Sequence, residues 1–242
     1  MDNGKTLVLF DVGGVLLALN YLAFYQRGAE LTGVSSEEFR KSFIDSGIEL
    51  RALNGDISNE EYQTRLKQLL NRPEMTRRDL EDFVKTMWER EIYDVVDLKE
   101  RVYFNANCPV NIFSNNNQFA FEYLSRTYPR MMQTFHPELV PICSFMSLGV
   151  KPKPMMYNDA QLCAERAGCE RIILIDDNAN YVLKGIETFG WSGIHFTSHI
   201  DYSEAIRSIA GHTANVTPNG SFKVANSLLE LEEGLRSFGI GI

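Results

Sequence analysis

Three short runs of apolar, β-prone residues, at 7–10, 110–113 and 171–175, each end in a cluster of polar residues. Unbroken apolar runs of this length are typical of strands buried on both faces, as in a parallel sheet. The clusters that follow are Asp11 with Gly13-Gly14, Ser114-Asn115-Asn116-Asn117, and Asp176-Asp177-Asn178. The pattern predicts that these polar residues stand at the carboxyl ends of three strands.

Helical patterns follow these strands, at about 118–126, 154–167 and 179–189. Alternation of strand and helix favours an α/β fold with a right-handed, doubly wound parallel sheet of the Rossmann-like kind. Ligands of such sheets bind outside the carboxyl ends of the strands. All three polar clusters are therefore expected to face one crevice.

The segment from about 20 to 92 differs, because it contains amphipathic helical stretches and no convincing strand. The stretches lie at 21–32, 36–46, 59–70 and 77–91. We interpret this segment as a small α-helical insertion in the core. The predicted division is a core of residues 1–18 and 94–242 and an inserted helical domain of residues 19–93.

Capping residues and the end of the chain give weaker signals. Ser58-Asn59-Glu60-Glu61 is predicted to form a capping box that opens one of the inserted helices, and Thr76 is predicted to cap the next. The last fifty residues suggest a strand at 193–196, a helix near 202–209, a polar loop at 211–220 and a final helix near 225–237. No residue in this region suggests chemistry, and the sequence does not reveal the role of 211–242.

Composition narrows the range of partners. The net charge of −8 gives no global attraction to nucleic acid or to anionic membranes, so neither is an expected partner. The four cysteines form neither a CxxC pair nor a Cys/His cluster, which argues against zinc or a disulfide framework and favours the cytoplasm. The apolar stretch at 7–24 is interrupted by Asp11 and lacks a clean cleavage site, so a targeting role is not expected.

Four sequence motifs, in order, resemble those of the haloacid dehalogenase (HAD) superfamily of hydrolases. They are Phe10-Asp11-Val12-Gly13-Gly14-Val15, then Phe113-Ser114-Asn115, then Gly149-Val150-Lys151-Pro152 with Tyr157, then Ile175-Asp176-Asp177-Asn178. The helical insertion after the first motif is similar to the C1 cap of this superfamily. Within it, the chain looks most like phosphatases similar to bacterial glucose-1-phosphatase and to the amino-terminal phosphatase of soluble epoxide hydrolase.

The resemblance implies a magnesium-dependent phosphatase that acts on a small, sugar-phosphate-like metabolite. Phosphoryl transfer needs an in-line nucleophile, and Asp11 is the candidate that would form an aspartyl-phosphate. Two adjacent acids, Asp176 and Asp177, repel each other unless a cation compensates them. Mg²⁺ suits this position because it favours oxygen ligands. Family likeness adds the Asp11 carboxylate and the Gly13 backbone carbonyl to the metal ligands.

Ser114, Asn115 and Lys151 are the predicted phosphate-binding residues. Ser114 would donate a hydrogen bond to a phosphate oxygen, and the Asn115 N–H, expected at the start of a helix, would add an anion site. Lys151 would be the cation that holds Asp11 and the phosphate together. Lys153 is a nearby competitor, but the six-residue spacing to Tyr157 favours Lys151.

Gly13 departs from the superfamily pattern. Most phosphatases of this superfamily carry at this position a second Asp, the general acid and base for the leaving group. Loss of a positioned acid costs about 10²–10⁴ in rate. Three consequences are possible: a proton donor from elsewhere, a leaving group that hardly needs protonation, or low activity. Relatives of glucose-1-phosphatase can share the replacement, so phosphatase chemistry stays the favoured hypothesis.

Three rival functions stay open. Haloacid dehalogenases also lack the second Asp, but they need no metal and do not keep the acidic pair. Phosphonoacetaldehyde hydrolases use a Schiff-base lysine from the cap, for which Lys41, Lys67 and Lys85 are candidates. A catalytically silent member would bind a phosphometabolite or a protein. Neither the identity of the substrate nor the oligomeric state can be read from the sequence.

Overall fold

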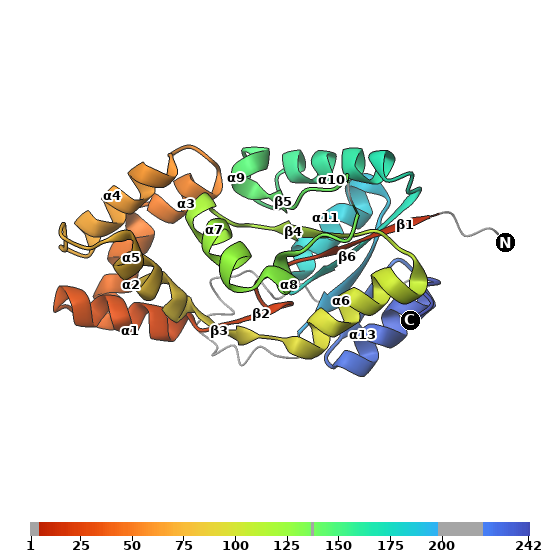
Figure 1. Ribbon diagram of the computed structural model, residues 1–242, viewed down its shortest axis with the longest axis horizontal. Coiled ribbons are helices and arrows are strands. Elements are labelled where there is room, and N and C mark those ends of the chain that lie inside the picture. Colours follow the sequence, from red (N-terminus) through yellow and green to blue (C-terminus); the bar gives the residue numbers. More distant parts are fainter. Residues whose placement is uncertain (1–4, 137, 198–219) are drawn as a thin grey trace.

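A six-stranded parallel sheet forms the core of the molecule (Figure 1). The computed structural model describes residues 5–136, 138–197 and 220–242. Within these residues the strand order is β5-β4-β1-β6-β7-β8, and all the neighbouring pairs are parallel. The strands are β1 (Thr6–Phe10), β4 (Val110–Ser114), β5 (Ile142–Cys143), β6 (Arg171–Asp176), β7 (Ser192–Phe196) and β8 (Phe222–Ala225). The sheet is the doubly wound α/β core that the sequence predicts.

Strand β1 lies between β4 and β6, and its register brings three strand ends to one level. Phe10 is opposite Ile112 on one side and opposite Ile175 on the other. Asp11 follows Phe10 directly, while Ser114 and Asp176 lie one or two residues beyond the paired positions. The polar residues that end these strands therefore meet at the same edge of the sheet, where α/β proteins bind ligands.

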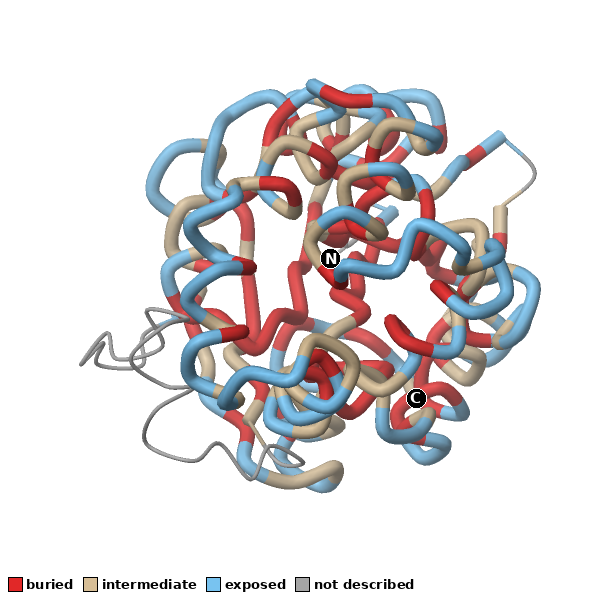
Figure 2. The backbone as a smooth tube through the Cα atoms, turned by 90° about the vertical axis from the view of Figure 1, so that its left-hand side faces the viewer, coloured by how far each residue is buried: buried red, intermediate tan, exposed pale blue. Residues whose placement is uncertain are grey.

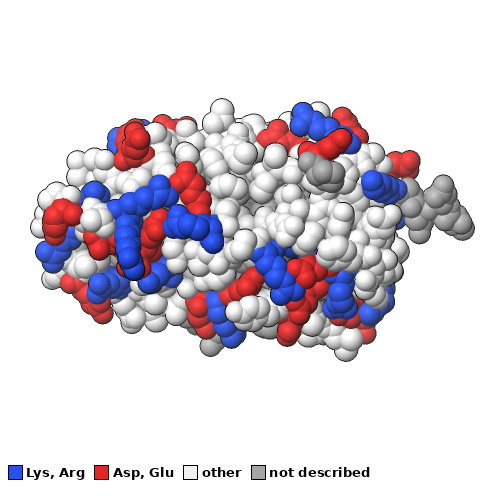
Figure 3. All heavy atoms as spheres, viewed as in Figure 1, with Lys and Arg blue, Asp and Glu red and all other residues white. Residues whose placement is uncertain are grey.

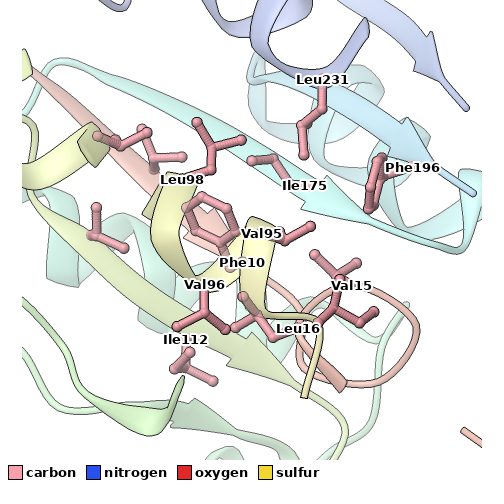
Figure 4. Packing of buried hydrophobic residues seen from close by; sticks show 14 of the residues in the cluster. Phe10, Val15, Leu16, Val95, Val96, Leu98, Ile112, Ile175, Phe196 and Leu231 are labelled. Atoms are coloured by element: carbon pink, nitrogen blue, oxygen red, sulfur yellow. The ribbon is translucent and has the colours of Figure 1, made fainter. Parts of the chain in front are cut away.

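Helices cover both faces of the sheet. They are α6 (Tyr93–Ala106), α7 (Gln118–Thr127), α8 (Pro129–Met132), α9 (Ser144–Ser147), α10 (Pro154–Arg166), α11 (Ala179–Phe189) and α13 (Leu228–Ser237). Successive β1 residues point to opposite faces. Val8 and Phe10 pack with α6 and α13 (Figure 4), while Leu7 and Leu9 pack beneath α10. Both faces of β1 are thus buried, which explains its unbroken apolar sequence.

The cap is a separate group of helices beside the core, at the left of Figure 1. Its helices are α1 (Tyr21–Thr32), α2 (Ser36–Asp45), α3 (Ile48–Leu53), α4 (Asn59–Leu69) and α5 (Arg77–Val84). They enclose an aromatic cluster that includes Phe24, Phe39 and Phe83. Ser58 caps α4 and Thr76 caps α5 through side-chain hydrogen bonds from backbone N–H groups, so both caps are confirmed. The reciprocal bond to Glu61 that a capping box requires is not found among the described residues, and the Glu61 carboxylate instead accepts from Arg65.

The connection between cap and core corrects the sequence analysis. The predicted helix at 77–91 ends at Val84, and a 3₁₀-helix η1 (Lys85–Met87) and a strand β3 (Trp88–Glu91) follow it. β3 pairs antiparallel with β2 (Leu17–Leu19). A strand of this length forms only when a partner strand satisfies its backbone. Because that partner is about seventy residues earlier, the local pattern does not reveal the strand.

Most of the other predicted helices and strands are confirmed, but several observed elements were not predicted, and one prediction lies outside the described residues. The predictions of helices at 118–126, 154–167 and 179–189 and of a strand at 193–196 are confirmed to within a few residues. The final helix begins at Leu228, because 222–225 forms the edge strand β8. Helices α3 and α6 and strand β5 were not predicted. The helix expected near 202–209 lies outside the described residues.

The surface is charged and mixed, whereas the strands are buried at the centre of the molecule (Figure 2). Acidic and basic side chains intermingle on the face in Figure 3. Some of these pairs join the cap to the core, since Arg77 of α5 contacts Glu122 of α7 and Arg126 of α7 contacts Glu81 of α5. None of the helices in the described part of the chain has the length and apolar character needed to cross a membrane.

Candidate active site

Asp11 occupies the first position after the central strand. Its backbone N–H donates to the carbonyl of Ile175 (2.9 Å), so the hydrogen bonding between the strands continues one residue beyond β1. Its side-chain Oδ1 accepts from the N–H of Val12 (2.8 Å). The residue is 7% exposed. Asp11 is therefore a buried, oriented carboxylate that keeps a small accessible surface, as a nucleophile requires.

Asp11, Asp176 and Asp177 come together as a cluster of three carboxylates. One carboxylate oxygen from each lies within 4.8 Å of the others, although the residues come from two strand ends. Burial and the neighbouring Asp11 charge raise the pKa of Asp176, while Lys151 opposes this shift. An all-oxygen donor set of this size fits Mg²⁺, which takes a few carboxylates and completes its shell with water or phosphate. The residues present thus suit the predicted metal.

Lys151 stands within the acidic cluster. Its Nζ lies 2.6 Å from Asp176 Oδ2 and 3.2 Å from Asp11 Oδ1, and it also donates to the carbonyl of Phe113 (3.0 Å). Burial alone would lower the pKa of this amine, but the carboxylates of Asp11 and Asp176 outweigh burial and raise it. Lys151 is therefore a fixed positive charge, and it links the candidate nucleophile to the acidic pair.

The loop after β4 holds Ser114 and Asn115, and the geometry corrects part of the prediction for Asn115. Helix α7 begins only at Gln118, with Asn117 as its cap, so the Asn115 N–H is not at a helix start. Instead the Asn115 side chain accepts from the backbone N–H of Lys151 (2.8 Å). Asn115 thus positions the lysine. Ser114 is buried at the end of β4, beside this contact.

The turn after Asp11 has little room for a side chain at position 13. A Cβ atom on Gly13 would lie 2.9 Å from Cδ1 of Leu19, the end of a flexible side chain on strand β2, which would have to shift. Gly14 has a φ of 75°, in the left-handed region that favours glycine, and its N–H donates to the Leu17 carbonyl. The chain therefore turns back on itself, and a leucine side chain occupies the position that an acidic side chain would need.

Several supporting residues were not identified from the sequence. Asn178 caps α11 and donates its N–H to Asp176 Oδ1 (2.8 Å). His195 of β7 places Nε2 3.0 Å from the Asp177 carbonyl, and burial lowers its pKa. Ser144 exchanges hydrogen bonds with the backbone of Asn116. A cap following the acidic pair is a recognisable signal, but the contacts of His195 and Ser144 depend on strand pairing.

The three cap lysines considered for a Schiff base lie elsewhere. Lys41 pairs with Asp45, and Lys85 pairs with Asp82, both on the surface of the cap. Lys67 is on α4, where its charge acts on Asp79 of α5. Among the described residues, no contact joins any of the three to Asp11 or Lys151.

Comparison with known proteins gives the fold. No family model and no curated protein matches the chain. Among solved structures, a HAD family enzyme from Bacteroides thetaiotaomicron, in complex with magnesium and inorganic phosphate, aligns with a TM-score of 0.66 at 20% identity over 84% of this chain and all of that one. L-2-haloacid dehalogenase from Xanthobacter autotrophicus, with chloropropionic acid covalently bound, aligns with a TM-score of 0.58 at 15% identity over 96% of this chain and 98% of that one.

A third structure, of a predicted HAD-like family hydrolase from Porphyromonas gingivalis, aligns with a TM-score of 0.62 at 20% identity, covering 85% of this chain and 97% of that one. The chain therefore has the HAD fold, with a parallel-sheet core and an inserted helical cap.

Proposed function

We propose that the protein is a magnesium-dependent phosphatase that acts on a small, sugar-phosphate-like metabolite through an aspartyl-phosphate on Asp11. The charge of the site is the observation that carries this proposal. Three clustered carboxylates and the single ammonium of Lys151 leave two negative charges. One divalent cation would neutralise them, and without it the buried like charges are costly. A dehalogenase, which needs no metal, has no use for this excess of acid.

The chain's own residues would perform the phosphoryl transfer as follows. A carboxylate oxygen of Asp11 attacks phosphorus while Lys151 holds that carboxylate and offsets the charge on the phosphoryl group. The Ser114 hydroxyl donates a hydrogen bond to a phosphoryl oxygen. When held by Asp11, Asp176, Asp177 and the Gly13 carbonyl, Mg²⁺ supplies further positive charge to these oxygens. Water then attacks the aspartyl-phosphate, which releases inorganic phosphate and restores Asp11.

The comparisons support the proposal without deciding it. The Bacteroides thetaiotaomicron enzyme of the same fold was crystallised with magnesium and inorganic phosphate. The Xanthobacter autotrophicus enzyme carries chloropropionic acid as a covalent adduct. The proposed setting is the cytoplasm, because all four cysteines are buried free thiols. The proposed partner is the small metabolite, with no nucleic acid or membrane.

The test is release of inorganic phosphate from a panel of sugar phosphates and acyl phosphates, with and without Mg²⁺. We expect Mg²⁺-dependent turnover by the wild type and at least about a 10⁴-fold loss in Asp11→Asn, as removal of a nucleophile causes in other covalent enzymes. Asp94→Asn, at an exposed position on α6, is the matched control and should keep full activity. Chloride release from chloropropionate without phosphate release would contradict the proposal in favour of dehalogenation.

A further inference from the structure

The absence of an acid at position 13 raises the question of what protonates the leaving group. Position 13 is a glycine and supplies no acid, and the end of the Leu19 side chain lies beside it. The remaining core carboxylates are already engaged, since Asp11 is the proposed nucleophile and Asp176 and Asp177 are proposed metal ligands. A proton donor supplied by the cap would replace the acid that position 13 lacks.

Glu49 is a cap carboxyl that is held at the junction with the core. It is the second residue of α3, and its Oε1 accepts from Nδ2 of Asn117 (2.9 Å). Asn117 is buried and caps α7, three residues after Ser114. Glu49 Oε2 accepts from the hydroxyl of Tyr62 on α4 (3.0 Å). One carboxyl oxygen is thus fixed to the loop that carries the phosphate-binding Ser114, and the other is fixed to the cap.

The pKa of Tyr21 responds both to Glu49 and to the core carboxylates. It is the first residue of α1, two residues after the Leu19 that covers Gly13. Burial raises the pKa of its phenol, and the nearby charges of Asp177, Glu49 and Asp11 raise it further. Glu49 and the candidate nucleophile thus both act on one phenol, and α3 is held against the core by the contact of Glu49 with Asn117.

The surroundings of Glu49 favour its protonated form. No ion pair joins Glu49 to any described residue, and the titratable groups around it are the neutral phenols of Tyr21, Tyr25 and Tyr62. Arg40 acts on Tyr25, and the carboxylates of Asp177 and Asp11 act on Tyr21. Burial raises the pKa of Glu49, and the hydrogen bonds from Tyr62 and Asn117 only partly oppose the shift.

We propose that Glu49 is the general acid for the leaving group, supplied by the cap in place of the acid that position 13 lacks; the proposal rests on the phosphatase function proposed above. In the first step an Asp11 oxygen bonds to phosphorus as the bond from phosphorus to the ester oxygen breaks. The Glu49 proton passes to that oxygen, so the alcohol leaves neutral. In the second step the Glu49 carboxylate takes a proton from the attacking water, and both side chains return to their starting states.

The leaving-group test compares wild type and Glu49→Gln on p-nitrophenyl phosphate, whose phenolate leaves readily, and on phenyl phosphate, whose phenolate is more basic. The measured quantity is kcat/KM, which includes the step that expels the leaving group. We expect Glu49→Gln to lose about 10²–10⁴-fold on phenyl phosphate and much less on p-nitrophenyl phosphate. Glu60→Gln, at an exposed site on α4, is the control and should match the wild type on both substrates.

The pH profile gives a second measurement, which a merely structural role would not change. An acid must be protonated to act, so wild-type kcat/KM on phenyl phosphate should fall as pH rises through the raised pKa of Glu49, and Glu49→Gln should lack this alkaline limb. Tyr62→Phe removes a hydrogen bond that favours the carboxylate, so its limb should move to higher pH.

Stability gives a measurement that is independent of activity. Folding raises the pKa of Glu49, so the protonated carboxyl favours the folded state. This contribution to the free energy of unfolding is fully present below the ordinary carboxyl pKa. It is lost as pH rises through the raised pKa of the folded state. Glu49→Gln should lack this pH dependence. Its melting temperature, relative to that of the wild type, should therefore increase as pH rises through that range.

The possible outcomes separate the two proposals. If the wild type releases no phosphate that depends on Asp11, the phosphatase function is wrong and the role of Glu49 falls with it. If the wild type is active but Glu49→Gln loses equally on both substrates, or keeps the alkaline limb, then Glu49 is not the acid while the phosphatase proposal stands.

Discussion

The core and the cap each place carboxyl groups beside the site, but the two regions compensate them differently. In the core, Asp11 and Asp176 flank the ammonium of Lys151 at 3.2 and 2.6 Å. In the cap, the hydrogen bonds that Glu49 receives from the described residues come from the neutral groups of Tyr62 and Asn117. Burial raises the pKa of both Asp176 and Glu49, but the Lys151 cation opposes the shift at Asp176, whereas only neutral donors oppose it at Glu49. The core is thus suited to hold a metal and a nucleophile, and the cap to supply a proton.

The two regions also differ in what stabilises them. The core is a sheet buried on both faces, with the site at its edge. The cap has a cluster of aromatic rings, in which Phe39 contacts Phe24, Phe43 and Phe83. A Cβ on Gly28 of α1 would lie 2.1 Å from the Phe39 ring, so the two helices pack here at the closest distance that glycine allows. The cap therefore has a hydrophobic cluster of its own, distinct from the charged residues of the core site.

The variant with the largest expected change in stability tests whether the cap and the proposed metal site of the core are independent. Phe39→Ala removes a ring that is 1% exposed, so the free energy of unfolding should fall by about 3–5 kcal/mol. The increase in melting temperature caused by Mg²⁺ should persist, because the proposed ligands all belong to the core. Calorimetry with and without Mg²⁺ measures both quantities, and Leu9→Ala in the core is the matched comparison. A cap variant that no longer responds to Mg²⁺ would show that the cap helps to form the metal site.

The same contrast explains how much the sequence could predict. In the core, each polar cluster directly follows an apolar run, so Asp11, Asp176 and the edge they share follow from strand geometry. Lys151 came from its motif, and the structure places it between the two acids. The prediction for Asn115 was partly wrong, because a loop of three residues separates Ser114 from helix α7. The local pattern does not show how long such a loop is.

In the cap, helices α1, α2, α4 and α5 were predicted, but α3 and its contact with the core were not. Glu49 lies on α3, a helix of six residues whose cap, Gly47, makes no side-chain hydrogen bond. Neither a long periodic pattern nor a capping signal marks such an element. The contact of Glu49 with Asn117 joins residues 68 positions apart in the chain. Only the packing of the cap against the core brings them together, so sequence periodicity carries no information about this contact.

A smaller change is expected at the metal site proposed for the core. At a Mg²⁺ concentration 100 times Kd, a folded state that alone binds the ion gains about 2.7 kcal/mol. Replacing both Asp176 and Asp177 with Asn should remove this gain, and the melting temperature should then be independent of Mg²⁺. Thermal unfolding of the wild type, the double variant and Asp94→Asn provides the comparison. If the double variant still responds as the wild type does, the ion binds elsewhere and the charge argument for the core is wrong.

The smallest expected change in stability comes from a variant that tests whether the core could supply the acid that we assign to the cap. Gly13→Asp alone should destabilise the protein by about 1–3 kcal/mol, because its Cβ would lie 2.9 Å from Leu19 Cδ1 in a packed turn. Leu19→Ala should relieve this contact, so the double variant Gly13→Asp/Leu19→Ala should recover part of the loss.

Combined with Glu49→Gln, the double variant should also recover activity on phenyl phosphate, since a core acid would then replace the missing cap acid. Leu19→Ala with Glu49→Gln is the control, which opens the space without adding an acid and should stay slow. If that control recovers equally, water in the opened space protonates the leaving group. If neither recovers, an acid at position 13 cannot reach the ester oxygen in this fold. The replacement of Asp by Gly would then reflect the position of Leu19 and strand β2, and a proton donor in the cap would be a requirement of the fold.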